Sequence, residues 1–308
     1  MDKLSVVIPV YCNELNLPQT YQTIKQILEQ IPASEYEIIF VDDGSRDRSH
    51  EILSQYAQSD SRCKIIKLSK NYGSHIAILA GFTYCTGDCA VMISADLQDP
   101  PELIPEMYKF WEKGHKSVLA VREDREESFA SKLLSNFFYK LMKRYALAEI
   151  PEGGFDFFLI DRQIIDLITK MQEKNSHLMT QVLWTGFKPV VIPYKRKKRE
   201  FGESMWTLSK KIKLFIDSFT AFSYLPLKLV SISGIIFAFI GLFYAIFIIF
   251  NRIFYSVPIA GWASLMVVLL AVSGVQLISI GIIGEYLWRN FDETRNRPIF
   301  IVENKLNF

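Results

Sequence analysis

The sequence has 308 residues, half of them hydrophobic, with 35 basic and 33 acidic side chains and a formal net charge of +2. This composition excludes intrinsically disordered, collagen-like and disulfide-stapled proteins, and the near-neutral charge gives no sign of nucleic-acid binding. Charged residues make up 22% of the chain, near the roughly 25% typical of soluble proteins, so the apolar excess predicts a soluble part and a separate membrane part.

The N-terminal segment carries a short apolar run, Leu4 to Ile8, before Pro9, and this run is too short for the core of a signal peptide. The cysteines form no CxxC pair and lie beside no histidine cluster, so zinc-site spacing is absent. They are Cys12, Cys63, Cys85 and Cys89. A reducing compartment fits best, and we expect the first part of the chain to fold in the cytoplasm.

Up to about residue 200, short runs rich in valine and isoleucine alternate with amphipathic helical stretches. This alternation predicts an α/β domain with a mostly parallel sheet and helices on both faces. Asp42, Asp43 and Asp96 end predicted strands, where open α/β sheets bind their ligands. The predicted strands cover 5–11, 35–43, 63–69, 89–96 and 117–123, and the clearest helices cover 17–31 and 49–59.

Asp96 and Gln98 stand two positions apart just past a predicted strand, in SADLQDPPE. Carboxylate and amide oxygens are hard ligands, and in an extended segment the side chains at i and i+2 point the same way. The pair therefore predicts a site for one Mg²⁺ or Mn²⁺ ion, with positions left for phosphate oxygens, and makes Asp96 a catalytic candidate. The alternative is an ordinary turn or helix-capping aspartate.

Four segments occur in order along this domain: SVVIPVYCNELNLP, FVDDGSRDRS, KNYGSHIAILAGF and ISADLQDPPE. The set resembles glycosyltransferase family 2 over about residues 4 to 205, and this resemblance implies a GT-A (Rossmann-like) fold that binds a nucleotide sugar. A tyrosine ring can stack on the base, and a carboxylate can accept a base or ribose proton. The resemblance implies donor contacts at Pro9, Tyr11, Glu14, Asp42, Asp43, Lys70, Asn71, Asp96 and Arg199.

The D-x-Q-x-P-P-E motif, a GESxW segment and two apolar C-terminal segments narrow the resemblance to the polyisoprenyl-phosphate glycosyltransferases. It is greater to the bactoprenol glucosyltransferases than to the dolichol-phosphate mannose synthases. The implied reaction moves glucose from UDP-glucose to undecaprenyl phosphate, with a divalent metal ion and inversion at the anomeric carbon. A guanine base, and N-acetylglucosamine, galactose or mannose as the sugar, stay open.

Three positions depart from the pattern of these relatives. Ser94 stands where many have the first aspartate of Asp-Ala-Asp-Leu-Gln, so one acidic neighbour of the metal site is missing. Cys12 shifts the following Asn-Glu pair by one residue, which changes the expected nucleotide contacts. Met205 stands where a lysine is frequent, so no lysine at that position binds phosphate.

Charged residues after the fifth predicted strand are candidates for the acceptor end of the site. A lipid phosphate is already an anionic nucleophile, because its second pKa is about 6, so it needs a cationic cradle more than a base. We expect Arg122 to act in catalysis and, with Arg125, to hold the acceptor phosphate; Lys132 and Ser135 resemble the family's contacts to that phosphate. The resemblance also implies that Asp156 orients a sugar hydroxyl or acts as a base. The alternatives are a solvated helix start for Arg125 and Lys132 and a turn aspartate at 156.

Two long uncharged segments carry the apolar excess, residues 229–250 and a helix from about Trp262 to Trp288. Each is long enough for a bilayer core about 30 Å thick. Lysine and arginine gather on their outer flanks, while the link between them carries Arg252 alone, so both termini are expected in the cytoplasm. The sequence predicts a multi-pass protein of the bacterial plasma membrane, and the small residues in both helices suit a homo-oligomer.

An amphipathic pattern over residues 207–223 predicts a helix on the membrane surface, the alternative being a helix packed on the soluble domain. Because the donor loops all lie before Arg199, a chain cut near that residue is expected to keep nucleotide binding largely intact. The predicted organisation is a GT-A domain over 1–205, surface helices over 206–226, a transmembrane pair over 227–290 and a cytoplasmic tail over 291–308.

Two other functions compete with lipid glycosylation. A processive polysaccharide synthase would carry Gln-x-x-Arg-Trp, but Gln181 to Trp184 contains no arginine, and two helices cannot enclose a polymer. A membrane-anchored scaffold with an inactive transferase domain is the second rival, and the presence of Asp96 and Gln98 argues against it. Metal-dependent binding of UDP or GDP would separate an enzyme from such a scaffold.

Overall fold

The computed structural model describes residues 2–31, 35–123, 151, 154–171, 173, 177–196, 225–255 and 261–308. The chain divides into two compact units, Met1–Ser218 together with Arg297–Phe308, and Phe219–Asn296. The predicted surface helix over 207–223 lies outside the described residues. So do four predicted site residues: Arg125, Lys132, Ser135 and Arg199.

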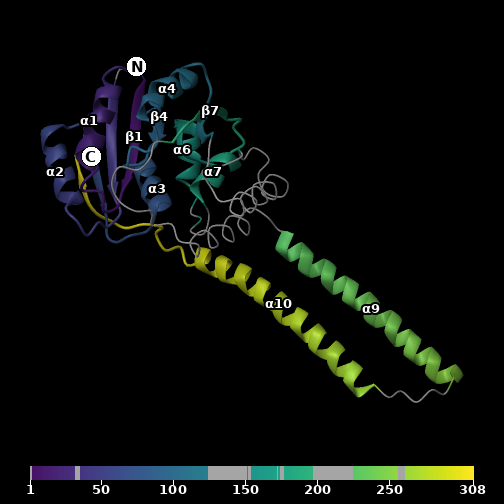
Figure 1. The fold of residues 1–308 in the computed structure, drawn as a ribbon. Helices are drawn as coiled ribbons and strands as arrows, with labels where there is room; N and C mark the ends of the chain where they lie inside the picture. The colour runs from purple at the N-terminus through teal and green to yellow at the C-terminus, as the bar shows by residue number, and fades with distance from the viewer. Residues whose placement is uncertain are drawn as a thin grey trace. The chain divides into compact units, whose positions relative to one another are not determined.

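The first unit is built on one eight-stranded sheet with the order β7-β5-β6-β4-β1-β2-β3-β8. Figure 1 labels β1, β4 and β7 of this sheet. β1, β2, β3 and β4 are mutually parallel where they pair, β5 is parallel to β7, and β6 and β8 run antiparallel to their neighbours. The mostly parallel α/β prediction is confirmed. The strands are β1 (Lys3–Val10), β2 (Glu35–Asp42), β3 (Cys63–Leu68), β4 (Cys89–Met92), β5 (Ser117–Arg122), β6 (Phe155–Asp161), β7 (Val190–Tyr194) and β8 (Val302–Leu306).

Helices cover both faces of this sheet. On α1 (Leu17–Leu28) the buried residues Leu17, Tyr21, Ile24 and Leu28 recur every three or four positions, so one face of the helix enters the core. That core cluster also holds side chains of β1, α2 (Ser49–Ser59) and α4 (Ile104–Glu112), the last preceded by a short helix, η1 (Pro101–Leu103). α3 (Ser74–Tyr84), α6 (Arg162–Ile168) and α7 (Leu178–Trp184) contact one another.

A glycine brings α3 close to the sheet. A Cβ added at Gly81 would lie 2.3 Å from Cγ1 of Val7 on β1 and 3.2 Å from Cγ2 of Val41 on β2. Real Cβ atoms do not approach other atoms so closely, so only glycine lets the helix pack at this distance. The C-terminal half of α3 therefore packs directly on β1 and β2.

The C-terminal segment differs from the predicted separate tail over 291–308. The apolar helix α10 runs to Thr294, and Val302–Leu306 then forms β8, an edge strand of the eight-stranded sheet. Ser69 donates its backbone N–H to the carbonyl oxygen of Ile301 at 3.0 Å. Residues Val302–Leu306, with the sequence VENKL, are mostly polar, and such a segment is easily interpreted as an exposed tail. An edge strand needs only one buried face, so a segment of this kind can also join a sheet. A chain cut near residue 199 therefore loses a strand of the donor domain.

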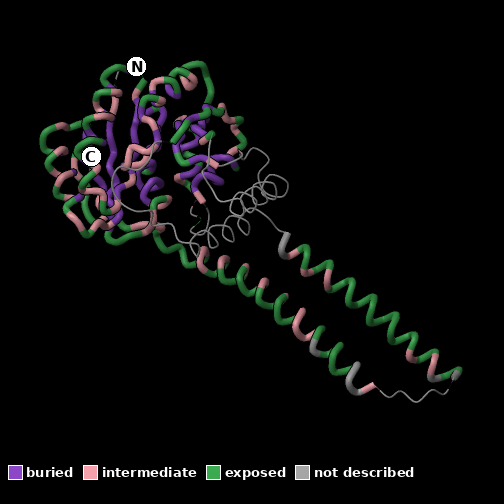
Figure 2. The backbone as a smooth tube through the Cα atoms, viewed as in Figure 1, coloured by how far each residue is buried: buried purple, intermediate pink, exposed green. Residues whose placement is uncertain are grey.

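The second unit contains two helices, α9 (Leu225–Tyr255) and α10 (Trp262–Thr294). Within them, Leu227–Asn251 and Leu265–Thr294 are long and apolar enough to cross a membrane, by length and composition. The described residues of these helices are mostly exposed, whereas those of the sheet strands in the first unit are mostly buried (Figure 2). The two predicted apolar helices are confirmed as helices.

Candidate active site

The acidic end of β2 lies inside the protein. Asp42 is fully buried, and its Oδ1 accepts a hydrogen bond from the backbone N–H of Ser45 at 2.9 Å. Its Oδ2 has no hydrogen-bond partner among the described residues. The nitrogen Nδ1 of His50 lies 3.5 Å from this oxygen, but the two atoms do not form a hydrogen bond. A buried carboxylate oxygen without a donor is costly, and a ligand N–H or O–H would satisfy it.

Asp43 holds the loop that follows β3. Its two carboxylate oxygens accept the backbone N–H groups of Tyr72 at 2.7 Å and Gly73 at 2.8 Å. Burial raises the pKa of Asp43 to about 6; the two backbone hydrogen bonds oppose that rise, while the nearby Asp42 adds to it. Asp43 thus has a structural role in this loop, and its predicted contact with the nucleotide stays a prediction.

The loop after β3, Ser69 to Gly73, is called the donor loop below. Gly44 has a φ of +70°, and a Cβ there would lie 2.7 Å from the backbone carbonyl carbon of Lys70 and 2.9 Å from the amide nitrogen of Asn71. The β2 end therefore packs directly on the donor loop. The side chains of Lys70 and Asn71 are exposed at this point.

The loop after β1 is tied to the start of α2. Cys12, in the left-handed region with φ of +53°, donates its N–H to Oγ of Ser45 at 3.0 Å. The Glu14 carboxylate accepts the N–H of Arg48 at 3.0 Å, so it has a structural partner. Pro9 lies within β1 opposite Val41, and Tyr11 follows the strand. Pro9, Tyr11 and Glu14 thus lie at the end of β1, next to the end of β2.

Asp96 stands in a turn, not in the extended segment that the sequence predicts. Leu97 has a left-handed φ of +52°, and Oδ1 of Asp96 accepts Oγ–H of Ser94 at 2.7 Å and the N–H of Gln98 at 3.3 Å. The side chain bonds its own backbone two residues on, which favours a turn. Asp96 and Gln98 are half-buried in this turn.

Asp99 connects this turn to Tyr194 on β7. The sequence alone assigned Asp99 no role. It is fully buried, accepts a hydrogen bond from the Tyr194 hydroxyl, and shares with Asp96 the single hydroxyl hydrogen of Ser94, whose Oγ lies 3.1 Å away. Nε of Arg196 lies 3.4 Å from its Oδ1. Burial, and then the charge of Asp99, raise the pKa of Tyr194, so the phenol remains a donor at neutral pH.

Arg122 on β5 and Asp156 on β6 form an ion pair. Arg122 ends β5 and Asp156 begins the antiparallel β6, so the two strands bring them together. Nε of Arg122 also donates to the Tyr194 hydroxyl at 3.3 Å. The Arg122 side chain is 16% exposed and that of Asp156 is 54% exposed. The guanidinium is therefore mostly buried, while the carboxylate is accessible to solvent.

The resulting chain of contacts runs from Asp96 through Ser94, Asp99 and Tyr194 to Arg122. The carboxylate of the predicted metal site and the guanidinium of the predicted phosphate cradle are therefore parts of one polar network. The aspartate of the motif was visible in the sequence, but Tyr194 carried no signal there.

Two histidines lie next to this network. The ring centroids of His75, on α3, and His177, before α7, are 3.7 Å apart. Both ring nitrogens of His75 are buried without a hydrogen-bond partner among the described residues. Burial lowers the pKa of His75 to about 4, against the opposing charge of Asp156, so the ring is neutral at pH 7. Sequence reasoning singled out neither residue.

The metal-ligand prediction rests on Asp96 and Gln98. No group of three or more His, Cys, Asp or Glu side chains that could hold a metal ion occurs within the part of the chain that the structure describes. Magnesium is commonly bound through one or two protein oxygens together with substrate phosphates and waters. The chemistry of this donor set therefore fits a divalent ion carried with a diphosphate.

Comparisons with known proteins show the family of this chain. The family model described as Glycosyl transferase family 2 matches residues 5–169. The chain is 43% identical to an uncharacterized glycosyltransferase, YkcC, of Bacillus subtilis, covering 97% of this chain and 93% of that protein. It is 33% identical to the bactoprenol glucosyl transferase of Shigella phage SfX, covering 98% and 99%.

Among solved structures, the fold is similar to glucosyl-3-phosphoglycerate synthase from Mycobacterium tuberculosis. The complex with UDP gives a TM-score of 0.51 at 14% identity, covering 71% of this chain and 79% of that one. A complex of the same enzyme with Mn²⁺, UDP-glucose and phosphoglyceric acid also gives 0.51, at 13% identity with the same coverage. At this identity the likeness shows the shared GT-A fold.

Proposed function

We propose, from the premise that this chain belongs to glycosyl transferase family 2, that it transfers glucose from a nucleotide sugar to the phosphate of a membrane polyisoprenyl phosphate. The observation that carries the proposal is the polar network joining Asp96 to Arg122. It links a carboxylate suited to a metal–diphosphate to a guanidinium suited to a second phosphate. The named activity of relatives such as the SfX enzyme supports the acceptor.

The donor is proposed to enter over the ends of β1, β2 and β3. Asp42 supports this, because its Oδ2 is buried without a donor among the described residues, and the N–H of a uracil base can supply one. Tyr11 is proposed to stack on the base, and Lys70 and Asn71, which are exposed, are proposed to contact the phosphates and ribose. UDP is the proposed nucleotide, since the structural neighbour binds UDP-glucose.

A divalent ion, Mg²⁺ or Mn²⁺, is proposed to be held by Asp96 and Gln98, and Mn²⁺ in the structural neighbour supports it. When bound, such an ion neutralises charge on the leaving diphosphate. Ser94 donates to Asp96, so the carboxylate is oriented by the chain itself. Asp99 accepts from the same Ser94 and keeps this orientation linked to the rest of the site.

The transfer step is proposed as one displacement. A lipid-phosphate oxygen attacks the anomeric carbon, the carbon–oxygen bond to the nucleoside diphosphate breaks, and the diphosphate leaves with that electron pair. No proton needs to be removed, because the phosphate is already anionic. Arg122 holds the acceptor phosphate, and Asp156, which pairs with Arg122, orients the arginine or a sugar hydroxyl.

The membrane is proposed as the place of reaction. The helices α9 and α10 suit an anchor, because a polyprenyl chain leaves a bilayer at a cost of about 0.8 kcal/mol per CH₂. A bacterial plasma-membrane location with the catalytic unit and both termini in the cytoplasm is proposed, and the lysines and arginines on the outer flanks of the apolar segments support this orientation. A homo-oligomer stays a prediction.

The direct test uses the purified full-length chain in nanodiscs that contain undecaprenyl phosphate. With labelled UDP-glucose and Mg²⁺ or Mn²⁺, we expect a lipid-linked monosaccharide and stoichiometric UDP. UDP-N-acetylglucosamine, UDP-galactose and GDP-mannose are compared in parallel to define the sugar and the base. A growing polymer would indicate a processive synthase, and nucleotide binding without product from any donor would indicate an inactive scaffold.

A further inference from the structure

The strand β8 reaches the donor loop. It pairs antiparallel with β3 from Ile65 opposite Leu306 to Leu68 opposite Val302, with an irregularity between Lys67 and Leu68. The pairing then continues one step further, where Ser69 donates its N–H to the carbonyl of Ile301 at 3.0 Å. Ser69 is the residue immediately before Lys70, so the C-terminal segment is bonded to the first residue of the donor loop.

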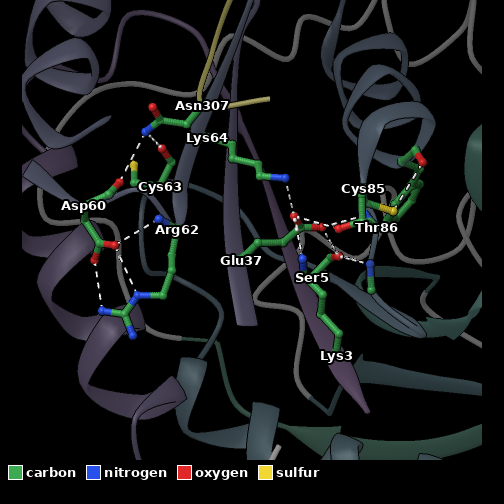
Figure 3. A network of polar contacts seen from close by, with 12 residues as sticks. Lys3, Ser5, Glu37, Asp60, Arg62, Cys63, Lys64, Cys85, Thr86 and Asn307 are labelled. Carbon is green, nitrogen blue, oxygen red and sulfur yellow. Dashed lines mark hydrogen bonds and ion pairs between the residues drawn. The ribbon is translucent and has the colours of Figure 1, made fainter. Parts of the chain in front are cut away.

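Asn307 locks the far end of β8. Its φ of +65° is left-handed, and its side-chain amide donates to the carbonyl oxygen of Ala57 at 2.7 Å. The same amide donates to the carbonyl oxygens of Cys63 at 2.8 Å and Asp60 at 3.3 Å (Figure 3). These carbonyls belong to the end of α2, the turn after it and the first residue of β3. One side chain thereby fixes the register of β8 along β3.

The last residues also touch α3, the helix that follows the donor loop. Nζ of Lys305 lies 4.2 Å from the ring centroid of Tyr84, the last residue of α3, and the rings of Tyr84 and Phe308 are 5.8 Å apart. Cations over aromatic faces and edge-to-face rings are favourable contacts. The C-terminal segment therefore contacts the element before the donor loop and the element after it.

The donor loop is held at its two ends by different parts of the chain. At the far end, Asp43 accepts the N–H groups of Tyr72 and Gly73. At the near end, Ser69 depends on Ile301. Between them, Lys70 and Asn71 are exposed, with their backbone resting on Gly44. Loss of the Ile301 contact would free the near end and leave these two side chains poorly placed.

We infer that β8 and its anchor Asn307 are positioning elements for the nucleotide-sugar donor, acting through Ser69 on Lys70 and Asn71. The inference rests on the proposed function for the identity of the donor. It gives the residues after the second apolar helix a part in substrate binding, because α10 continues directly into this segment.

The test compares Asn307→Ala with Asn304→Ala in the full-length chain. Both remove one amide side chain from the same segment, but Asn304, exposed and opposite Lys67, makes none of the contacts of Asn307. We expect Asn307→Ala to speed amide hydrogen exchange over residues 65–73 and to raise the KM for UDP-glucose about fivefold. The kcat and the KM for undecaprenyl phosphate should stay within about twofold, and Asn304→Ala should match the wild type.

A second measurement keeps the inference testable if Asn307→Ala does not fold. In the wild-type chain, UDP should slow exchange over residues 69–73 and also over 301–307, because the two segments share hydrogen bonds. Protection of the loop alone, or an Asn307→Ala chain with loosened 301–307 and an unchanged donor KM, would overturn the inference. If no lipid product forms from any donor, the proposed function fails, while the substrate-free exchange comparison still decides whether β8 holds the loop.

Discussion

Asp99 connects the two ends of the candidate site, although it has no proposed contact with a substrate. It is fully buried and takes hydrogen bonds from Ser94 on one side and Tyr194 on the other. A buried carboxylate is tolerated only when it is hydrogen-bonded and paired, and Asp99 has both kinds of partner because Arg196 lies 3.4 Å away. Its neighbours Asp96 and Arg122 are therefore oriented together.

Replacement of Tyr194 by Phe tests this connection. The variant removes the donor to Asp99 and the acceptor of Arg122 Nε without changing the size of the side chain. We expect kcat/KM for the lipid phosphate to fall about tenfold, with the affinity for UDP unchanged. Tyr36→Phe is the matched control, because its buried hydroxyl has no hydrogen-bond partner among the described residues. Equal effects in both variants would contradict the connection.

The metal assignment is tested at Asp96. Asp96→Ala should lower transfer by at least about a hundredfold, because a charged group aimed at the leaving diphosphate is lost. Its melting temperature should stay close to that of the wild type, since the carboxylate is half-buried in a turn. Asp166→Ala removes an exposed carboxylate paired with Arg162 and should retain activity. EDTA should stop the wild-type reaction, and Mg²⁺ or Mn²⁺ should restore it.

The stereochemistry of the product tests the single displacement. Direct attack by the lipid phosphate requires no covalent enzyme intermediate, so an α-linked nucleotide sugar should yield a β-linked lipid product. The anomeric coupling constant, measured by NMR on the isolated product, decides the question. An α-linked product would require two successive displacements and would refute the proposed mechanism.

At the scale of elements, Glu37 joins neighbouring strands of the sheet (Figure 3). It is 1% exposed on β2 and accepts Ser5 Oγ of β1 at 2.6 Å and the N–H of Thr86 at 2.6 Å, while Nζ of Lys64 on β3 lies 2.8 Å away. Burial alone would raise the pKa of Glu37, but the bonds from Lys64, Ser5 and Thr86 outweigh it and lower the pKa to about 2.

This network predicts a specific pH dependence of stability. Because the folded pKa lies below that of an unfolded glutamate, the stabilisation is complete above about pH 4.5 and is lost as the pH falls towards 2. Its size is about 3 kcal/mol by linkage. Glu37→Gln should melt well below the wild type at pH 7, and the gap should narrow at pH 3.5.

Thermal unfolding in detergent, followed by tryptophan fluorescence, measures the gap. Glu303→Gln is the control. Glu303, on the edge strand β8, forms a solvent-accessible ion pair with Lys67, and such pairs contribute little to the free energy of unfolding. Its melting temperature should follow the wild type at both pH values. A constant gap between Glu37→Gln and the wild type across this range would contradict the assignment of the low pKa.

At the scale of the whole molecule, the chain leaves the catalytic unit for two apolar helices and then returns to it. The unit Phe219–Asn296 is inserted between Ser218 and Arg297, and the returning residues complete the sheet. Anchoring and donor binding therefore have to be separated by an internal deletion and not by a C-terminal truncation.

Replacing Phe219–Asn296 by a flexible glycine-serine linker makes this separation. The product keeps β8, so we expect UDP binding and transfer to a short, soluble prenyl phosphate to remain near wild type. Transfer to undecaprenyl phosphate in vesicles should fall more than tenfold, because the anchor is gone. A plain truncation after residue 199 should instead lose UDP binding as well. Equal use of long-chain lipid by the deletion variant and the full chain would disprove the anchoring role.

The sequence by itself determined the features that local patterns encode. The alternation of apolar runs and amphipathic stretches predicted β1 to β5, α1 and α2, because side-chain periodicity reflects which face of an element is buried. The ordered motifs indicated the family, which the comparisons confirm. Long uncharged segments predicted α9 and α10 from length and hydropathy alone.

Only the tertiary structure decided the contacts between residues far apart in the chain. Asp99 and Tyr194 are 95 positions apart in the chain, and Asn307 and Ala57 are 250 positions apart. No local sequence pattern predicts either contact. The antiparallel β6 brings Asp156 to Arg122, and the edge position of β8 brings Ile301 to Ser69. Strand order follows from how the whole core packs, and that order is what turns separate motifs into one connected site.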